Sequence, residues 1–308
     1  MSIEPATRLL FALAILILAA LKIYTDTKFS AKKSEKRPYS TIFIGMIYSA
    51  LGISLAFVVD RENSSMIMVF FTVVAAMPFI YNVIRLEEKK DESIYDERIL
   101  LKEHSRAIET FIFLFIGMVI VFSLSKAFLP TAIGDELFLA QDNVIQNIIS
   151  GQATVSLQSL LGILSNNLSV LFFCIVFSLI YGLGAIYILT WNASVLGAAI
   201  GSFISTNLAS LSHLTGIEKG AEYFKVFSCG YFLRYLPHGI FEMLGFFVAG
   251  LAGAIISVAI VRKTFGTKKF ANVIYDSSDL ILIAIALIVL AAIIEVFFTP
   301  GLFRLLCS

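Results

Sequence analysis

Three ionisable residues lie close together in an apolar stretch, and their spacing permits acid–base or metal-binding chemistry. Residues 231–253 read YFLRYLPHGIFEMLGFFVAGLAG, a bilayer-compatible sequence that nevertheless contains Arg234, His238 and Glu242. A charged side chain at membrane depth costs from a few to more than about ten kcal/mol, so membrane anchoring alone does not account for these residues. His238 and Glu242 are four residues apart and therefore share one face of a helix, which Pro237 is suited to begin.

A second carboxylate is expected at the depth of Glu242. Glu242 follows Pro237 by five residues and Glu295 precedes Pro300 by five. If these helices run in opposite directions, each carboxylate lies about 7–8 Å from the same membrane surface. Asn167, at the expected start of another span, would lie on that side as well. The predicted polar centre has five members: Arg234, His238, Glu242, Glu295 and Asn167.

This polar centre has three interpretations. An Arg–Glu ion pair with His–Glu hydrogen bonds would fix helix packing, whereas two carboxylates and a histidine would relay protons or bind a cation. A hydrolytic site in which His238 and a glutamate polarise water is the third. No HExxH, GxSxG or paired-glutamate protease signature supports hydrolysis, and the ligand spacing specifies no particular metal. No cofactor is expected.

The composition is that of a polytopic membrane protein. Of the 308 residues, 58% are hydrophobic and 15% charged, with a mean hydropathy of +0.90. A soluble domain averages about 45–50% apolar and about 25% charged. The net charge of +1 provides no electrostatic basis for nucleic-acid binding. Cys174, Cys229 and Cys307 form no disulfide or zinc pattern, and we expect them to be small buried apolar residues.

We predict an all-α, polytopic transmembrane helical bundle of about eight spans, plus a re-entrant or interfacial helix over residues 221–236, before Pro237. The prolines and charged residues mark the expected span ends. A turn is expected at Trp191-Asn192-Ala193-Ser194, and Asn166 and Asn192 are predicted to be polar residues at helix ends. The expected spans are residues 7–24, 40–59, 66–84, 110–129, 167–190, 195–210, 237–261 and 280–299.

Basic residues orient these spans, because cytoplasmic loops carry excess Lys and Arg. The segments 28–37, 85–106 and 262–269 hold 15 basic residues, whereas the loops on the other side hold four. We therefore expect a cell-membrane protein with both termini extracytoplasmic.

Three regions are expected along the chain. Residues 1–130 would form a four-span region with a charged cytoplasmic helix at 85–109. Residues 131–159, which contain three acidic residues and no Lys or Arg, would form an extracytoplasmic interfacial segment. Residues 160–308 would form a second four-span domain. Small residues at helical spacing predict close helix contacts within it: Gly197, Gly201, Gly245, Ala249 and Gly253.

The C-terminal half resembles the stage II sporulation protein M family of bacterial and archaeal integral membrane proteins. The resemblance covers about residues 160–300 and rests on NN at 166–167, WNASVLG at 191–197, PHGIFE at 237–242 and EVFFTP at 295–300. The founding member of that family resembles a scaffold that holds cell-wall hydrolases at a membrane. The resemblance implies no catalytic activity, and it leaves the role of the first four spans open.

Our leading hypothesis is a multi-pass membrane scaffold or envelope-complex subunit with a buried polar centre. The alternatives are a transporter or channel component that moves a cation, proton or small solute past Glu242 and Glu295, and an intramembrane hydrolase. The expected partners are membrane lipid, other membrane or envelope proteins and a second copy of the chain. The expected docking surfaces are residues 87–109 and 131–159.

Overall fold

The computed structural model is all-helical across the residues that it describes. These are residues 33–34, 36–93, 97–151, 157–181, 185–211, 216–261 and 268–307, and they contain no strand. Seven helical stretches in this part of the chain are long and apolar enough to cross a membrane. They correspond in order to the second to eighth expected spans, although the fifth and sixth begin about ten residues earlier than expected. The first expected span, residues 7–24, lies outside the described residues. The predicted all-α membrane bundle is thereby confirmed.

The chain divides into two compact units, residues 1–118 and residues 119–308. The division falls inside α4 (Glu97–Phe128). The three-region organisation expected from the sequence is not tested by this division and stays a prediction. The expected charged helix at 85–109 is shared between the end of α3 (Ser64–Ser93) and the start of α4, with residues 94–96 between them outside the described part.

In the first unit, α2 (Thr41–Val59), α3 and the start of α4 pack through small residues. A Cβ on Gly52 would lie 2.6 Å from the carbonyl oxygen of Met68 in α3, and a Cβ on Gly45 would lie even closer to the carbonyl oxygen of Leu114 in α4. The hydroxyl of Thr41 lies within hydrogen-bonding distance of two carbonyl oxygens, that of Pro38 at 2.6 Å and that of Thr110 at 2.9 Å. The second contact brings α2 against α4.

The second unit contains the predicted polar residues. After α4 come α5 (Thr131–Leu137), α6 (Leu139–Gly151), α7 (Leu157–Tyr181) and α8 (Ala185–Ser210). They are followed by α9 (Gly216–Ser228), the π-helix η2 (Cys229–Leu233) and α10 (Leu236–Val261). The last elements are α11 (Lys268–Ile293), the π-helix η3 (Ile294–Phe298) and α12 (Thr299–Cys307).

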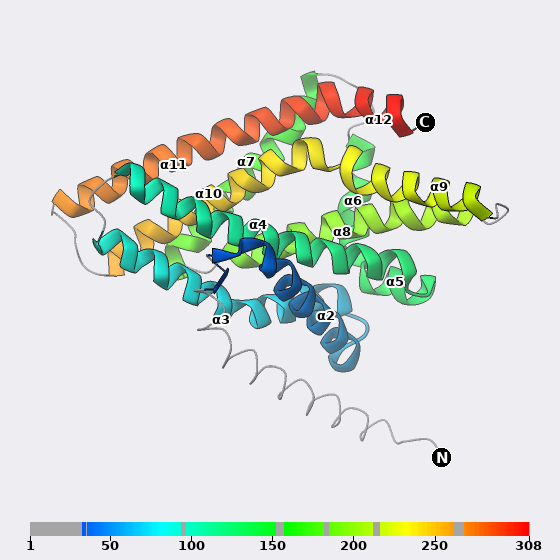
Figure 1. Cartoon of the computed structure of the whole chain (residues 1–308), viewed down its shortest axis with the longest axis horizontal. Helices are drawn as coiled ribbons and strands as arrows, with labels where there is room; N and C mark the ends of the chain where they lie inside the picture. The colour runs from blue at the N-terminus through cyan, green and yellow to red at the C-terminus, as the bar shows by residue number, and fades with distance from the viewer. Residues whose placement is uncertain are drawn as a thin grey trace, which may run out of the picture. The chain divides into compact units, whose positions relative to one another are not determined.

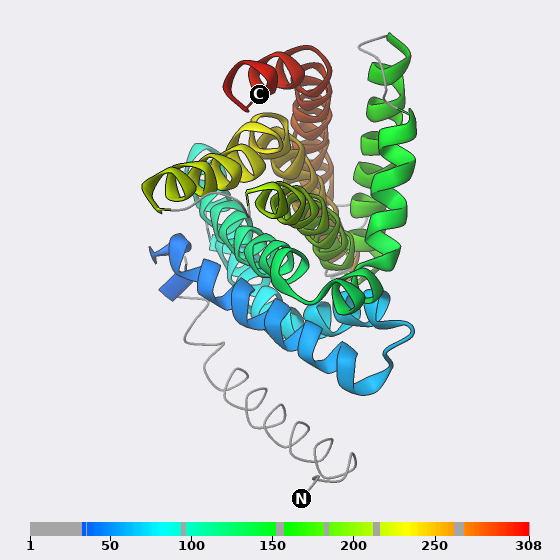
Figure 2. The same cartoon turned by 90° about the vertical axis from the view of Figure 1, so that its right-hand side faces the viewer.

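Helices α10 and α11 run side by side in opposite directions, as the colour change along them shows (Figure 1). The view in Figure 2 faces the end of this unit at which α9 and α12 lie. A Cβ added to Gly245 would lie 3.1 Å from the carbonyl oxygen of Ala284 in α11. A Cβ added to Gly253 would lie against Ile175 and Ser178 in α7. The small-residue stripe of α10 therefore lies against two helices, α11 and α7.

The structure corrects three boundaries expected from the sequence. The turn predicted at residues 191–194 lies inside α8, because Asn192 donates to the carbonyl oxygen of Ile188 and Ser194 to that of Trp191, which are bonds within a helix. Asn166 and Asn167 lie inside α7, not at its start. The break expected at Leu236-Pro237 lies just before it, at the turn of Arg234 and Tyr235 that follows the π-helix η2, and α10 begins at Leu236. Whether α9 is re-entrant or interfacial stays a prediction.

The cysteine prediction is wrong for two of the three cysteines. Cys229 in η2 and Cys307 in α12 form a disulfide, although 78 residues separate them. Only Cys174 is a buried free thiol, as expected. The spacing of the cysteines in the sequence does not indicate this pair, because Cys229 and Cys307 meet only in the folded chain.

Candidate polar and metal centre

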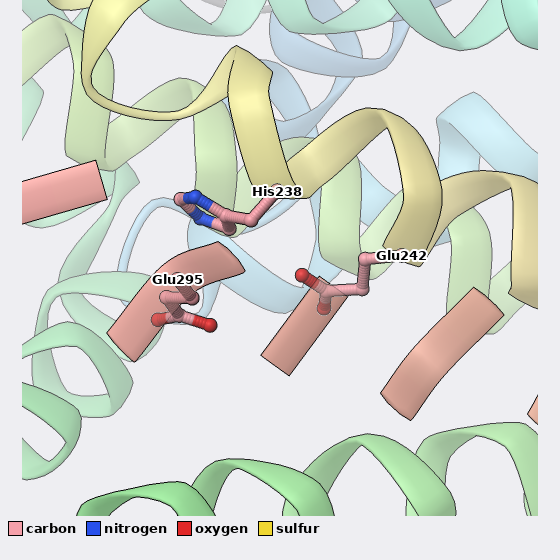
Figure 3. A group of neighbouring side chains, drawn as sticks. All are labelled: His238, Glu242 and Glu295. Atoms are coloured by element: carbon pink, nitrogen blue, oxygen red, sulfur yellow. The ribbon is translucent and has the colours of Figure 1, made fainter. Parts of the chain in front are cut away.

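The first two members of the candidate centre lie in the first turns of α10. Pro237 is the second residue of this helix, where its missing N–H leaves no hydrogen bond unmade. His238 and Glu242 follow one turn apart on the same face, and both project toward α11 (Figure 3). Both side chains are partly buried. This part of the centre is local and follows directly from i, i+4 spacing.

The third member, Glu295, lies in the π-helical turn η3 at the end of α11. In η3 the backbone N–H of Thr299 donates to the carbonyl oxygen of Ile294, five residues back. Pro300 has no N–H to continue the regular pattern, which is one reason for the helix to widen here. π-Helical turns inside α-helices are frequent at functional sites. Here the wide turn sets the direction in which Glu295 leaves the helix.

The side chains of His238, Glu242 and Glu295 converge between α10 and η3 (Figure 3). One ligand atom from each residue, an imidazole nitrogen or a carboxylate oxygen, lies within 4.8 Å of the other two. These residues form the only such group among the residues that the structure describes. Carboxylates this close together need a proton or a cation between them, because an unpaired charge in apolar surroundings is costly.

The imidazole of His238 is oriented by Thr299. His238 Nδ1 lies 3.3 Å from Thr299 Oγ1, and Thr299 Oγ1 also lies 3.2 Å from the carbonyl oxygen of Ile294. The carbonyl can only accept, so one arrangement makes both contacts hydrogen bonds at once: Thr299 donates its single hydroxyl proton to Ile294 and accepts from His238 Nδ1–H. In that tautomer the lone pair of His238 Nε2 is free. Thr299 is not among the members predicted from the sequence, although the motif EVFFTP that begins at Glu295 ends in a Thr-Pro pair.

Arg234 does not join the carboxylates. Its guanidinium carbon lies 5.3 Å from the ring centre of Phe203, 5.6 Å from that of Tyr235 and 5.4 Å from that of Phe303. Within the described residues no ion pair links Arg234 to Glu242 or Glu295. The aromatic cage holds the cation by its ring faces. The Arg–Glu pair considered as a structural role for this centre is therefore not formed.

Asn167 is a buried residue of α7, and its membership of the centre stays a prediction. Gly253 of α10 contacts Ile175 and Ser178 of α7, while Ile163 of α7 packs in one cluster with Ala292 and Val296, at the other end of the α10–α11 pair. Helices α7 and α10 therefore run parallel, and the same offset of residue numbers carried along them would bring residue 167 to the level of residues 242–245. Asn167 is 4% exposed and its Oδ1 accepts from Asn166 Nδ2.

The remaining predicted residues are not members of the group formed by His238, Glu242 and Glu295. Gly197 and Gly201 of α8 face the end of α4, where an added Cβ on Gly201 would lie 2.6 Å from the carbonyl oxygen of Ser123. Ala249 is fully buried in α10. Asn166 is exposed, and Asn192 is bonded to its own helix.

Lys126 is a charged residue that the sequence analysis missed. It lies at the end of α4, where its Nζ contacts Asp142 Oδ2 at 2.7 Å and Asp135 Oδ1 at 2.9 Å. Its side chain is only 8% exposed. The available signal was the acidic segment 131–159, which lacks a basic residue of its own and directly follows Lys126.

These features define a polytopic, all-helical membrane protein with a polar group between two of its helices. The model of the stage II sporulation protein M family matches residues 110–300, more than half of the chain, and the chain belongs to that family. The match begins before the resemblance noted from the sequence and includes the fourth expected span. The fourth span, which that resemblance left out, is therefore part of the family region.

An uncharacterized protein of Methanocaldococcus jannaschii is similar to this chain. The two are 33% identical over 141 residues, which cover 45% of this chain and 69% of the relative. No solved structure matches the chain.

Proposed function

We propose that the protein is a non-enzymatic, multi-pass scaffold of the cell envelope. The observation that carries this proposal is a set of contacts between helices at one end of the second unit. We call this end the braced end. The contacts join α4 to α5 and α6, α4 to α9, α8 to α12, and η2 to α12. The residue pairs are Lys126 with Asp135 and Asp142, Phe128 with Phe227, Phe203 with Phe303, and Cys229 with Cys307.

Bracing of this kind favours a scaffold over an alternating-access carrier. A carrier opens its bundle on each side in turn, so its helix ends must separate during transport. Here a disulfide, a two-carboxylate ion pair and Arg234 between two aromatic rings oppose that separation. A preformed surface also loses little conformational entropy when a partner binds, which is an advantage for a protein that holds others in place.

The braced end is expected on the extracytoplasmic side. The basic segment 262–269 follows the end of α10 that is opposite the braced end. Loops with an excess of Lys and Arg usually lie in the cytoplasm, so the braced end is expected on the other side. A disulfide at the braced end agrees, because disulfides persist mainly in oxidising compartments. With eight spans, both termini would lie outside the cell membrane.

Site-specific photo-crosslinking in native membranes tests the scaffold. A photoreactive residue at Leu139 in α6 or at Leu305 in α12 would face a partner bound at the braced end, since both side chains are more than half exposed. The matched control is Phe172 in the middle of α7, which is 58% exposed on an apolar span. We expect the same discrete adduct from both test positions and only lipid adducts from the control. An adduct of twice the chain's mass would identify a second copy as the partner, and no protein adduct from either position contradicts the scaffold.

A second candidate function is passage of a cation or proton past Glu242 and Glu295. The observation that favours it is that two carboxylates converge and that the guanidinium of Arg234 lies over aromatic rings instead of between them. Proteoliposomes that contain the purified chain should then show gradient-driven flux, and Glu242→Gln or Glu295→Gln should abolish it. Absence of flux from the parent protein excludes this function and leaves the scaffold.

A further inference from the structure

We propose that His238, Glu242 and Glu295 bind a divalent transition-metal ion between α10 and η3. This inference goes beyond the scaffold role and does not depend on it. It rests on three independent features of the centre: the free nitrogen of the histidine, the spacing of the ligand atoms and the balance of charge.

The histidine is prepared as a metal ligand. When Thr299 Oγ1 accepts a hydrogen bond from Nδ1–H, the lone pair on Nε2 is available to an ion. Histidine ligands in metal sites characteristically donate their second ring nitrogen to an oxygen acceptor, which fixes both tautomer and ring orientation. Thr299 Oγ1 supplies that acceptor here, and the π-helical turn that carries Glu295 holds Thr299 in place.

The spacing of the three ligand atoms fits an ion. A triangle whose sides are at most 4.8 Å has a centre no farther than about 2.8 Å from each corner, against metal–ligand distances of about 2.0–2.2 Å. Small side-chain rotations would therefore bring all three atoms into coordination. Three protein ligands leave a coordination position for water or another group.

Charge balance favours a dication. Two carboxylates in an apolar helix pair would otherwise have to take up protons, because Arg234 is held among Phe203, Tyr235 and Phe303. A divalent ion neutralises both at once. One imidazole nitrogen with two carboxylate oxygens suits Zn²⁺, Mn²⁺ or Fe²⁺, whereas Mg²⁺ and Ca²⁺ prefer oxygen ligands alone and Cu⁺ prefers sulfur.

The test is metal binding by the purified full-length protein in detergent, with its disulfide intact. After removal of metal by chelation, the protein is incubated with Zn²⁺, separated from free ion and analysed by inductively coupled plasma mass spectrometry. We expect about one equivalent per chain for the parent and less than about a tenth for Glu242→Gln, Glu295→Gln and His238→Ala. The control, Glu222→Gln in α9, changes a glutamate outside the centre and should keep one equivalent.

Substitutions of Thr299 separate a weakened metal site from a misfolded protein, because they leave all three ligands in place. Thr299→Val should weaken Zn²⁺ affinity by about 10–100-fold, and Thr299→Ser, which restores the hydroxyl, should recover it. Each variant is compared by gel filtration and thermal midpoint in the chelated state. A parent protein that retains no Zn²⁺, Mn²⁺ or Fe²⁺ overturns the proposal. Full binding by the Glu242→Gln and Glu295→Gln variants overturns it equally, because the ion would then be bound elsewhere.

Discussion

Cys229 and Cys307 are joined by a disulfide that ties the turn before α10 to the helix after α11. Helix α10 carries His238 and Glu242, and the π-helical turn η3, between α11 and α12, carries Glu295. The bond therefore restrains the two chain segments that must stay in register for the candidate centre to exist.

Removal of this disulfide is expected to destabilise the second unit. A cross-link over 78 residues restricts the unfolded chain, so Cys307→Ser should lower the free energy of unfolding by about 2–4 kcal/mol. Thermal unfolding in detergent measures the effect. Thiol labelling of the unfolded parent should modify one cysteine without reductant and three with it; three without reductant would contradict the bond. Cys174→Ala gives the effect of losing a buried cysteine that forms no cross-link.

The two carboxylates that contact Lys126 are expected to differ in their contribution to stability. The side chain of Asp142 is 24% exposed and that of Asp135 is 65% exposed, so water screens the second contact more strongly. Asp142→Asn should cost about 1–3 kcal/mol and Asp135→Asn less than about 1 kcal/mol. Thermal midpoints of the two variants in one detergent provide the comparison. Equal losses would mean that burial does not distinguish these contacts.

The contact of α10 with α7 depends on the absence of a side chain at Gly253. A Cβ there would lie 2.7 Å from the carbonyl oxygen of Ile175 and 2.8 Å from Ser178 Cβ, so one helix would have to move. Gly253→Ala should therefore destabilise by about 1–3 kcal/mol. Gly162→Ala in α7, where nothing lies within 4 Å, should be neutral or stabilise by up to about 1 kcal/mol. A thermal scan of both variants should give shifts that differ in size and sign; a neutral Gly253→Ala would rule out this close packing.

The turn between α2 and α3 should loosen in acid. The Asp60 carboxylate accepts from the Asn63 side-chain amide at 2.8 Å and from the backbone N–H groups of Glu62 and Asn63. These bonds, chiefly that from the Asn63 side chain, lower the pKa of Asp60 below its ordinary 3.8. Because the folded pKa is depressed, the contribution is present above the unfolded pKa and is lost as pH falls through the folded value.

Amide exchange at residues 62–63 measures this loss. Protection should fall in acid as Asp60 takes up its proton, and Asn63→Ala should move the transition to higher pH. A transition that does not move in Asn63→Ala would exclude the side-chain amide as the cause.

Sequence reasoning identified the features that depend on local pattern. Hydropathy indicated the spans, although it put the turn between the fifth and sixth inside α8, and i, i+4 spacing put His238 and Glu242 on one face of α10. Depth along two antiparallel helices predicted that Glu295 would lie near Glu242, where the structure places it. The family followed from short motifs, and the family match confirms it.

Features that depend on tertiary contacts could not be predicted from the sequence. Arg234 was expected beside the carboxylates because opposite charges attract, but Phe203 and Phe303 come from α8 and α12 and surround it. The role of Thr299 depends on a π-helical turn, which periodicity does not indicate. The Cys229–Cys307 pair depends on two helix ends that meet in space.

The central claim is that residues 242 and 295 face each other between α10 and α11, and cysteine cross-linking in membranes tests it most directly. Glu242→Cys and Glu295→Cys are introduced into a Cys174→Ala chain with a protease site in the segment 262–267, and treated with a short bis-maleimide. Reduction then opens the native disulfide before cleavage. We predict that the two fragments stay joined, whereas a control pair with Tyr275→Cys, an exposed position near the other end of α11, separates. Separation of the 242–295 pair, with both thiols proven reactive, would contradict the account.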